Sequence, residues 1–533
     1  GLLPPTIGLD SKSGLELALP WYWNIAPNRD ATFTPVLMSR RGIDLGTEFR
    51  YLEDNYEGHV NASLMPDDRL RQRRRWSLFT QHSGRYDAGA LGPLGLRLNL
   101  NRVSDNDYWR DFTRRGEPLT TRLLANDGAL AWRSGALSVN LRALKWQTLQ
   151  DPTAPITPPY DRLPQVEARW SDHGLGGIDY SASAEFTRFR RTWAVGNDAD
   201  RSLLQVELSR PWVRPWGFLT PRLQLHATHY QFEHALADGA RTASRTLPTF
   251  SLDSGLVFER PTGVLGRAFT QTLEPRLKYI NTPYRDQGRL PLYDTGAYDF
   301  NFATIWSENS FAGHDRIADN HLVTAGLTSR LIDPDSGAEV LRLSVAQRYR
   351  FRPQKVVLPG EVAEDRGLSD TMLGASINWD PRWAFSTVVQ YNLDTRRSTR
   401  TTINARYMPE PFHALSAAYR RQRDVGSESI DVGWQWPLGD LLGRRAELGT
   451  TRKAGGGSCN GRWYGVGRLN YSLDEHRLVE GLVGFEYDAG CWIGRVVVEK
   501  LNRSYSSSTK RIMFQLEFVG QSRLGTSSLR SLR

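Results

Sequence analysis

Apolar and polar side chains alternate along most of this chain with a period of two residues, which predicts β-strands rather than helices. The clearest case lies near the C-terminus, where four apolar residues share one face: Ile512, Phe514, Leu516 and Phe518. The residues between them are Arg511, Met513, Gln515 and Glu517. Segments of this kind run for roughly 9–12 residues, which matches a tilted transmembrane strand better than the shorter strands of a soluble sandwich.

About 26 such strands follow one another. The first six are predicted at 2–9, 14–22, 31–39, 42–52, 57–65 and 74–83, and the last four at 461–472, 478–488, 491–502 and 510–519. No capped helical stretch and no linker interrupts the series. We therefore expect an all-β fold, a very large antiparallel transmembrane β-barrel of about 26 strands. It would form one domain over residues 1–533, with 520–533 as a periplasmic C-terminal tail.

The connections alternate in length, as they do in outer-membrane barrels with short periplasmic turns and long extracellular loops. The long ones follow odd-numbered strands: 104–118, 150–162, 190–201, 233–245, 281–320 and 353–369. The stretch 439–460 is an exception, because it is long where a short turn is expected.

Composition alone suggests a soluble protein, since only 39% of residues are hydrophobic and the formal charge is +10. No apolar run is long enough for a membrane helix. A search for long apolar runs does not detect a transmembrane β-barrel, because its alternating strands are hydrophilic on average. Of the 68 basic residues 61 are Arg, which suits nucleic acid, anionic lipid or plain surface charge. No secretory signal is visible at Gly1, so the chain is either cytosolic or a mature or trimmed piece of an exported protein.

Catalysis has little support in the sequence. His226 and His229 differ by three positions and would point to opposite faces of a strand, so they cannot share a metal. The usual zinc-protease, hydrolase and phosphate-loop motifs do not occur. We expect a protein that is not an enzyme and that needs no cofactor or metal.

Prolines stand out at the place where a barrel must close. The first and last strands have to pair, but proline has no N–H to donate to that ladder. Pro4 and Pro5 fall in the first predicted strand and Pro20 falls at the end of the second. They indicate a weakly paired seam against strand 510–519, whose apolar face carries Phe514, Leu516 and Phe518. The alternative is that these prolines only mark the starts and ends of strands.

Several blocks of the chain resemble the LptD family of LPS-assembly proteins. The longest of them reads PWYWNIAPNRDATFTP over residues 20–35. Others lie at 38–42, 48–52, 271–276, 283–287, 315–318, 323–330 and 524–526. Together they extend over nearly the whole chain.

The resemblance implies a 26-stranded barrel in the outer membrane of a Gram-negative cell. It implies a periplasmic N-terminal domain that precedes the barrel and connects it to the periplasmic Lpt bridge. It also implies a lipoprotein, LptE, that plugs the lumen, and lipopolysaccharide as the substrate inserted into the outer leaflet. The family's lateral-gate prolines correspond by spacing to Pro5 and Pro20.

One rival interpretation is a nutrient transporter of the TonB-dependent type, which would need a plug domain before its first strand. The other is a soluble nucleic-acid-binding β-protein, which would not need 26 alternating segments.

Two further groups of residues each allow two interpretations. Cys459 and Cys491 could each bond a cysteine of the implied periplasmic domain, as the family's turn cysteines do, or they could bond each other. The predicted extracellular turn at 67–75 carries five arginines: Arg69, Arg71, Arg73, Arg74 and Arg75. They could bind lipopolysaccharide phosphates with their forked donors, or they could simply keep the loop solvated.

Overall fold

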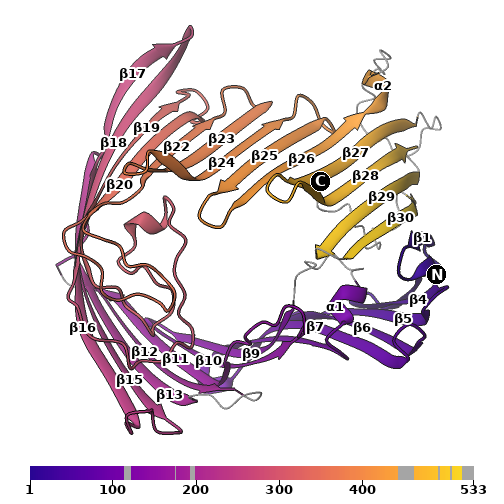
Figure 1. Cartoon of the computed structure of the whole chain (residues 1–533), viewed down its shortest axis with the longest axis horizontal. Helices are drawn as coiled ribbons and strands as arrows, with labels where there is room; N and C mark the ends of the chain where they lie inside the picture. Colours follow the sequence, from indigo (N-terminus) through magenta and orange to yellow (C-terminus); the bar gives the residue numbers. More distant parts are fainter. Residues whose placement is uncertain are drawn as a thin grey trace.

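The structure is a computed structural model that describes residues 1–112, 122–174, 176–191, 198–441, 461–489, 492–504 and 507–518. Its strands form one antiparallel sheet in which each strand pairs with its neighbours in sequence. The sheet closes where β1 (Thr6–Asp10) pairs with β30 (Ser507–Phe518) (Figure 1). The predicted fold class is therefore confirmed.

The first half of the wall contains fifteen strand segments: β1, β2 (Gly14–Ala18), β3 (Trp21–Ala26), β4 (Arg29–Met38), β5 (Gly42–Leu52), β6 (Tyr56–Asp68), β7 (Arg73–Asp87), β8 (Pro93–Val103), β9 (Leu123–Ser134), β10 (Leu137–Thr148), β11 (Asp161–His173), β12 (Asp179–Arg190), β13 (Ala199–Ser209), β14 (Trp212–Arg214) and β15 (Gly217–Phe232).

The second half contains the other fifteen: β16 (Thr242–Leu256), β17 (Phe258–Val264), β18 (Arg267–Thr282), β19 (Asn320–Ile332), β20 (Glu339–Arg350), β21 (Gly367–Leu368), β22 (Thr371–Ile377), β23 (Trp383–Asn392), β24 (Arg397–Tyr407), β25 (Ala414–Gln422), β26 (Ser427–Pro437), β27 (Arg462–Ser472), β28 (Arg477–Asp488), β29 (Trp492–Ser504) and β30.

Four of these barrel strands are interrupted, so that two segments follow each other along the same partner. They are β2/β3, β13/β14, β16/β17 and β21/β22. The thirty segments less these four interruptions give 26 barrel strands. The interruption between β2 and β3 contains Pro20, which agrees with the missing N–H donor of proline.

Helices are few and short in the described residues: α1 (Tyr108–Asp111), α2 (Leu438–Leu441) and the 3₁₀ turns η1 (Gly89–Leu91) and η2 (Thr304–Trp306). None of them is long and apolar enough to cross a membrane. Each predicted long connection lies between the two strands expected to flank it. These connections lie at one end of the barrel, which we call the long-loop end. Of the exceptional stretch 439–460, α2 is described up to 441. The rest of that stretch and the predicted tail 520–533 lie outside the described residues.

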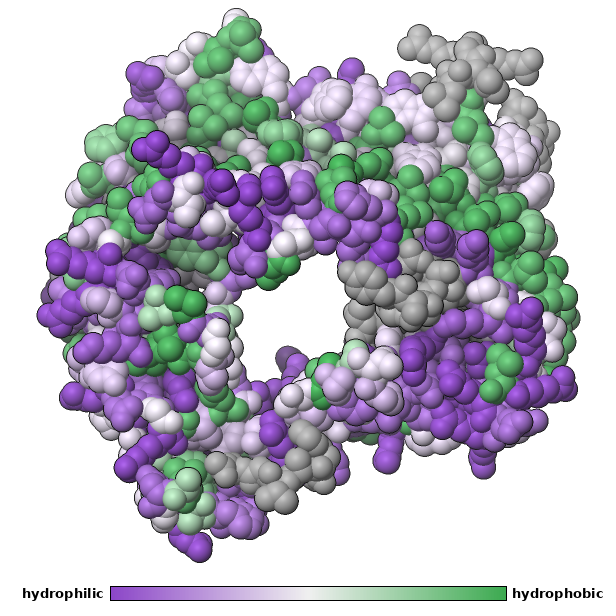
Figure 2. Space-filling model, in the orientation of Figure 1, coloured by the Kyte–Doolittle hydropathy of each residue, from purple (hydrophilic) through white to green (hydrophobic). Residues whose placement is uncertain are grey.

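The two faces of the wall follow the alternation in the sequence. Ile512, Phe514 and Leu516 are exposed on the outside of β30, whereas Arg511 and Gln515 point inward. Hydrophilic side chains surround much of the opening of the lumen (Figure 2). Because no single core fills the barrel, buried apolar residues gather in separate clusters where loops fold against the inner wall. The largest of these contains Phe189, Ala199, Tyr230, Phe232, Leu290 and Tyr293.

Two loops from the long-loop end enter the lumen. The first includes α1 and lies over β4–β7, where Phe112 packs against Val36, Met38 and Met65. The second is residues 283–319, which we call the luminal segment; it lies inside the barrel against the wall that contains β15–β20 (Figure 1). The lumen is therefore filled unevenly, and its two sides are built differently.

Candidate functional site: the strand seam and the lumen

The seam between β1 and β30 is short. Five residues of β1 pair with β30, from Thr6 opposite Gln515 to Asp10 opposite Arg511. On its other side β30 has twelve partners along β29. The residues of β30 beyond Gln515 continue to pair with β29 but have no ladder partner across the seam. Toward the long-loop end the ladder continues up to the β1–β2 turn, where the Ser11 N–H donates to the Lys510 carbonyl at 3.1 Å. Toward the short-turn end, the described residues of β30 beyond Gln515 are unpaired across the seam.

Prolines lie where the pairing stops. Pro4 and Pro5 come directly before β1, so the first strand begins at Thr6 and not at residue 2 as predicted. The physical reason is that two consecutive residues lack the N–H that a ladder needs. Of the predicted N-terminal part, Leu2 retains an isolated bridge to Trp21.

Pro20 lies beside this N-terminal stretch, because the backbone N–H of Leu3 donates to the Pro20 carbonyl at 2.9 Å. Thr6 pairs with Ala18 whereas Leu2 bridges Trp21. Four steps along the first strand therefore match three along the second, which is the geometry of a β-bulge. The three predicted gate prolines are brought together at one irregular end of the seam.

The outer surface of the seam is apolar. Ile7 and Phe514, which are register partners, are 45% and 50% exposed, and Leu9 is 53% exposed. Leu516 is also exposed, just past the last paired residue. Phe518 ends β30, and its side chain lies outside the described residues. Both strands of the seam therefore present a hydrocarbon-like outer surface.

The five arginines of the 67–75 turn do not form a free basic patch. Arg75 is fully buried and bonds to Asp68, Asp105 and Asp111, the last at 2.7 Å. Arg71 and Arg73 are paired with aspartates of the same loop that carries α1. Arg69 and Arg74 are exposed.

A fourth arginine, Arg41, joins the cluster through Asp68 at 2.6 Å and Asp111 at 3.2 Å. Burial by itself would raise the pKa of Asp111. The hydrogen bond from Arg71 and the charges of Arg41 and Arg75 outweigh it and lower the pKa of Asp111 to about 2. The cluster therefore holds the α1 loop against β4–β7 with ionised side chains at neutral pH.

A second buried charge cluster holds the luminal segment, and sequence reasoning missed it. Arg201 of β13 is fully buried and bonds to Glu185 of β12 and to Asp294 and Asp315 of the segment, at 2.7, 2.7 and 2.9 Å. The Tyr230 hydroxyl donates to Asp315 at 2.7 Å. Although burial would raise the pKa of Asp294, the hydrogen bond and charge of Arg201 lower it well below its ordinary value. The block 315–318, noted for its resemblance, thus contains an anchor of this segment.

Other strands hold the same segment at further points. Arg245 of β16 donates to the carbonyls of His314 and Asp315, and Arg348 of β20 donates to the carbonyl of Ile305 at 2.6 Å. Lys278 of β18 bonds to Glu308 at 2.6 Å. These contacts extend from β13 to β20, so the segment is fixed along a broad arc of the wall.

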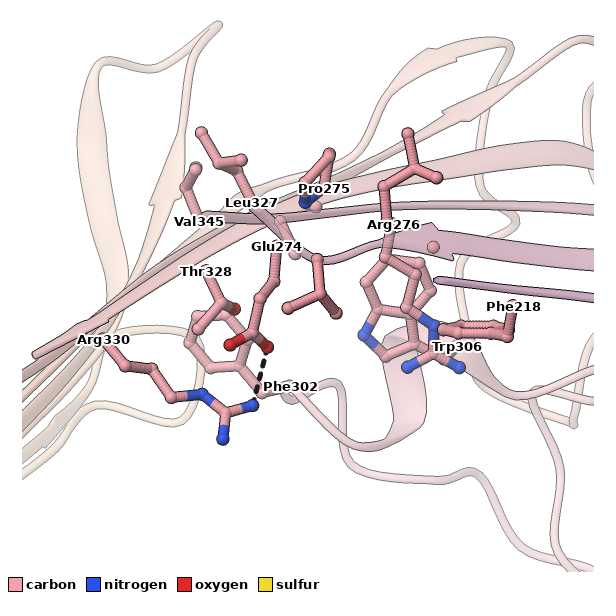
Figure 3. A pocket seen from close by; sticks show the side chains of 15 residues that line it. Phe218, Glu274, Pro275, Arg276, Phe302, Trp306, Leu327, Thr328, Arg330 and Val345 are labelled. Carbon is pink, nitrogen blue, oxygen red and sulfur yellow. Dashed lines mark hydrogen bonds and ion pairs between the residues drawn. The ribbon is translucent and has the colours of Figure 1, made fainter. Parts of the chain in front are cut away.

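A cleft lies where η2 meets β15–β20 (Figure 3). Its lining combines aromatic rings, among them Phe302 and Trp306, with the ion pair between Glu274 and Arg330 at 2.7 Å. Arg276 lies 4.2 Å from the Trp306 ring centre. Such a mixture of flat apolar rings and charged donors and acceptors suits a hydrated ligand with both apolar and polar faces.

Three residues or blocks that the sequence singled out are not among the described residues. Cys459 and Cys491 lie outside the described residues, so their pairing stays a prediction, as does the role of the block 524–526. Among the residues that are described, no group of three or more His, Cys, Asp or Glu side chains is arranged to hold a metal ion.

Comparison with known proteins gives a consistent family. A family model for LPS transport system D (LptD) matches residues 73–442. The LPS-assembly protein LptD of Albidiferax ferrireducens is 54% identical over all of this chain and 67% of its own length. The proteins of the same name from an Acidovorax species and from Ralstonia nicotianae are 55% and 37% identical, and the chain covers 66% and 64% of them. The chain thus spans about two thirds of the length of these curated relatives.

Among solved structures, the siderophore receptor PirA of Pseudomonas aeruginosa aligns with 96% of this chain and 80% of its own, at 9% identity and a TM-score of 0.34. The iron transporter FrpB of Neisseria meningitidis aligns with 97% of this chain and 80% of its own, at 9% identity and a TM-score of 0.37. Likeness at this level carries no argument about function.

Proposed function

The chain belongs to the LptD family, and we propose that it inserts lipopolysaccharide into the outer leaflet of the bacterial outer membrane. The observation that carries this proposal is the short β1–β30 seam beside a wide, mostly hydrophilic lumen. Its relatives are named for assembly and transport rather than for catalysis.

The amphipathic nature of the substrate explains why both features are needed. Sugars and phosphates require water or polar partners, which the lumen supplies. Acyl chains gain about 0.8 kcal/mol for each methylene that is removed from water, so they favour a sideways exit into the bilayer. A seam with an unpaired end and an apolar exterior supplies that exit. The cleft beside η2 offers aromatic rings and an ion pair to sugars that pass through the lumen.

In this assignment the long-loop end is extracellular and the short-turn end is periplasmic, as in other outer-membrane barrels. Arg69 and Arg74 remain exposed at the extracellular end, where they can meet phosphate groups of the outer leaflet. Arg71, Arg73 and Arg75 hold the loop instead, since aspartates already neutralise them.

The partners follow from the family resemblance. We propose that LptE occupies the open part of the lumen, and that a periplasmic domain connects the barrel to the Lpt bridge. Cys459 and Cys491 would bond either to that domain or to each other. Peptide mapping of the full-length protein without reduction distinguishes these pairings.

The route is tested by site-specific photo-crosslinking in living cells. A photoreactive residue is placed at Ile7 or Phe514, at the seam, or at the register pair Leu223 and Phe250 in the opposite wall. We expect lipopolysaccharide adducts to form at the seam positions during transport and not at the other pair. Adducts confined to positions deep in the lumen would contradict lateral exit.

A further inference from the structure

One ion pair in the barrel connects two strands that are not neighbours. Glu16 lies in β2 and Arg511 lies in β30, and β1 runs between these two strands. The Arg511 Nη2 and the Glu16 Oε2 are 2.8 Å apart. The two residues are 495 positions apart in sequence, so only closure of the barrel brings them together.

Gly8 is the residue of β1 nearest to this contact on the Glu16 side. It lies in β1 opposite Glu16 on one side and opposite Met513 on the other. Adjacent strands are about 4.8 Å apart, so β2 and β30 are separated by roughly 9.6 Å across β1. Glutamate and arginine together can span this interval, provided that β1 has no side chain on the inner face between them. A Cβ at Gly8 would meet only ordinary contacts, with the Ile512 carbonyl at 3.5 Å and the Glu16 Cβ at 4.0 Å.

The nearest carboxylate on β1 is engaged elsewhere. Asp10 is the direct register partner of Arg511. Its Oδ1 accepts hydrogen bonds from the backbone N–H groups of Lys12 and Ser13, at 2.7 and 3.0 Å, and so stabilises the β1–β2 turn. Arg511 instead reaches diagonally past β1 to Glu16.

The pair is sheltered from water. The side chains of Arg511 and Glu16 are 14% and 9% exposed. Charges at such a site attract each other more strongly than surface charges, and salt screens them less. Removal of one partner also leaves the other charge poorly solvated, so the pair resists separation.

We propose that Glu16 and Arg511 form a latch across the seam. Any separation of β1 from β30 must break it, because β1 stays paired with β2 and carries Glu16 away from Arg511. The latch lies near the long-loop end, whereas the described residues at the proline end form no ladder across the seam. The seam therefore opens from the short-turn end, and the latch sets how far and how often it opens. This inference rests on the proposed function for its biological meaning, but the latch itself can be measured without any substrate.

The test uses hydrogen exchange of the full-length protein in lipid nanodiscs free of lipopolysaccharide. In Glu16→Gln we expect exchange of the β1 amides, residues 6–10, to become about tenfold faster, with no change in β15 and β16. The double variant Glu16→Arg with Arg511→Glu restores the pair with reversed charges and should bring exchange back to within about threefold of the natural protein. Asp127→Asn is the matched control, because it breaks a 2.8 Å pair with Arg142 between the neighbouring strands β9 and β10.

Two outcomes overturn the latch: unchanged β1 exchange in Glu16→Gln, or a double variant that exchanges as fast as the single one. If Glu16→Gln does not fold into a heat-resistant barrel, Arg511→Lys takes its place. It keeps the charge but shortens the reach, and it should give an intermediate increase. Lipopolysaccharide delivery is then measured in cells with the same variants. Faster β1 exchange with unaltered delivery would support the latch and contradict the proposed lateral route. Failure of the latch and failure of the proposed function therefore give different results.

Discussion

The seam and the wall opposite to it are built from the same kind of strand but are held together very differently (Figure 1). β15 and β16 share fifteen register pairs, whereas β1 and β30 share five. Behind β15–β20 lies the luminal segment, which Arg201, Arg245, Lys278 and Arg348 fix in place. Across the seam a single described ion pair, between Glu16 and Arg511, adds to the ladder.

This difference shows that a closed barrel can contain one weakly paired interface between strands and still keep its fold. Every strand edge in a barrel is paired, so one short ladder lowers the local stability while the remaining ladders keep the sheet closed. Regions that must open are drawn from the low-stability parts of a protein. The seam has the features of such a part, and the opposite wall has those of a rigid frame.

The largest effect is expected in the rigid wall. In Arg201→Met the carboxylates of Glu185, Asp294 and Asp315 lose their shared counter-charge in a buried site. We expect a loss of about 3–5 kcal/mol, seen as a lower midpoint of urea unfolding from lipid vesicles, and faster protease cleavage within residues 283–319. Arg289→Met is the control, because its pair with Asp238 is exposed and should change stability by less than about 1 kcal/mol. Equal effects of the two variants would refute the anchoring role of Arg201.

A smaller effect is expected at the prolines, in the opposite direction. Pro5→Ala with Pro20→Ala restores two backbone donors at the unpaired end of the seam. Each new ladder bond is worth about 0.5–1.5 kcal/mol net, so the N-terminal stretch should exchange hydrogen more slowly and lipopolysaccharide delivery should fall. Pro261→Ala in β17 is the matched control, since it lies in a strand far from the seam. If delivery and antibiotic permeability remain at the natural level in the double variant, the prolines are only strand markers.

An effect that is confined to low pH is expected at the α1 loop. The pKa of Asp111 is about 2 in the folded state and lies below the ordinary carboxyl value near 3.8. Its contribution to stability, roughly 2 kcal/mol, is therefore fully present above about pH 4 and is lost as the pH falls toward 2. We expect protection of the α1 amides, corrected for intrinsic exchange, to fall over that interval. Asp111→Asn should remove most of this pH dependence, and a natural protein whose α1 protection is flat from pH 5 to 2 would contradict the assignment.

Local patterns predict much of this fold, because each strand carries its own alternation. The strand predicted at 42–52 is observed at Gly42–Leu52, and the one predicted at 478–488 is observed at Arg477–Asp488. The prolines of the seam are also visible in the sequence, since a missing N–H acts at its own position. Two consecutive prolines delay the start of β1, which begins four residues later than predicted.

Contacts between residues that are distant in sequence leave no such local pattern in the sequence. Arg201 is 93 residues from Asp294 and 114 from Asp315, and no periodic pattern links them. The turn at 67–75 looks like a free basic patch in the sequence because all but one of its described aspartate partners lie on the next long loop. The pair of Glu16 and Arg511 depends on closure of the whole barrel. Such features follow from register, which the alternation alone does not set.

In the proposed mechanism the seam opens while the opposite wall stays closed. The most direct test of this mechanism joins Ile7→Cys to Phe514→Cys across the seam with a short thiol crosslinker, and joins Leu223→Cys to Phe250→Cys across β15 and β16 in a parallel sample. Single-cysteine variants treated in the same way serve as controls. We predict that crosslinking the seam stops lipopolysaccharide delivery and that crosslinking β15 to β16 leaves it unchanged. Delivery at the natural rate through a crosslinked seam would contradict the account.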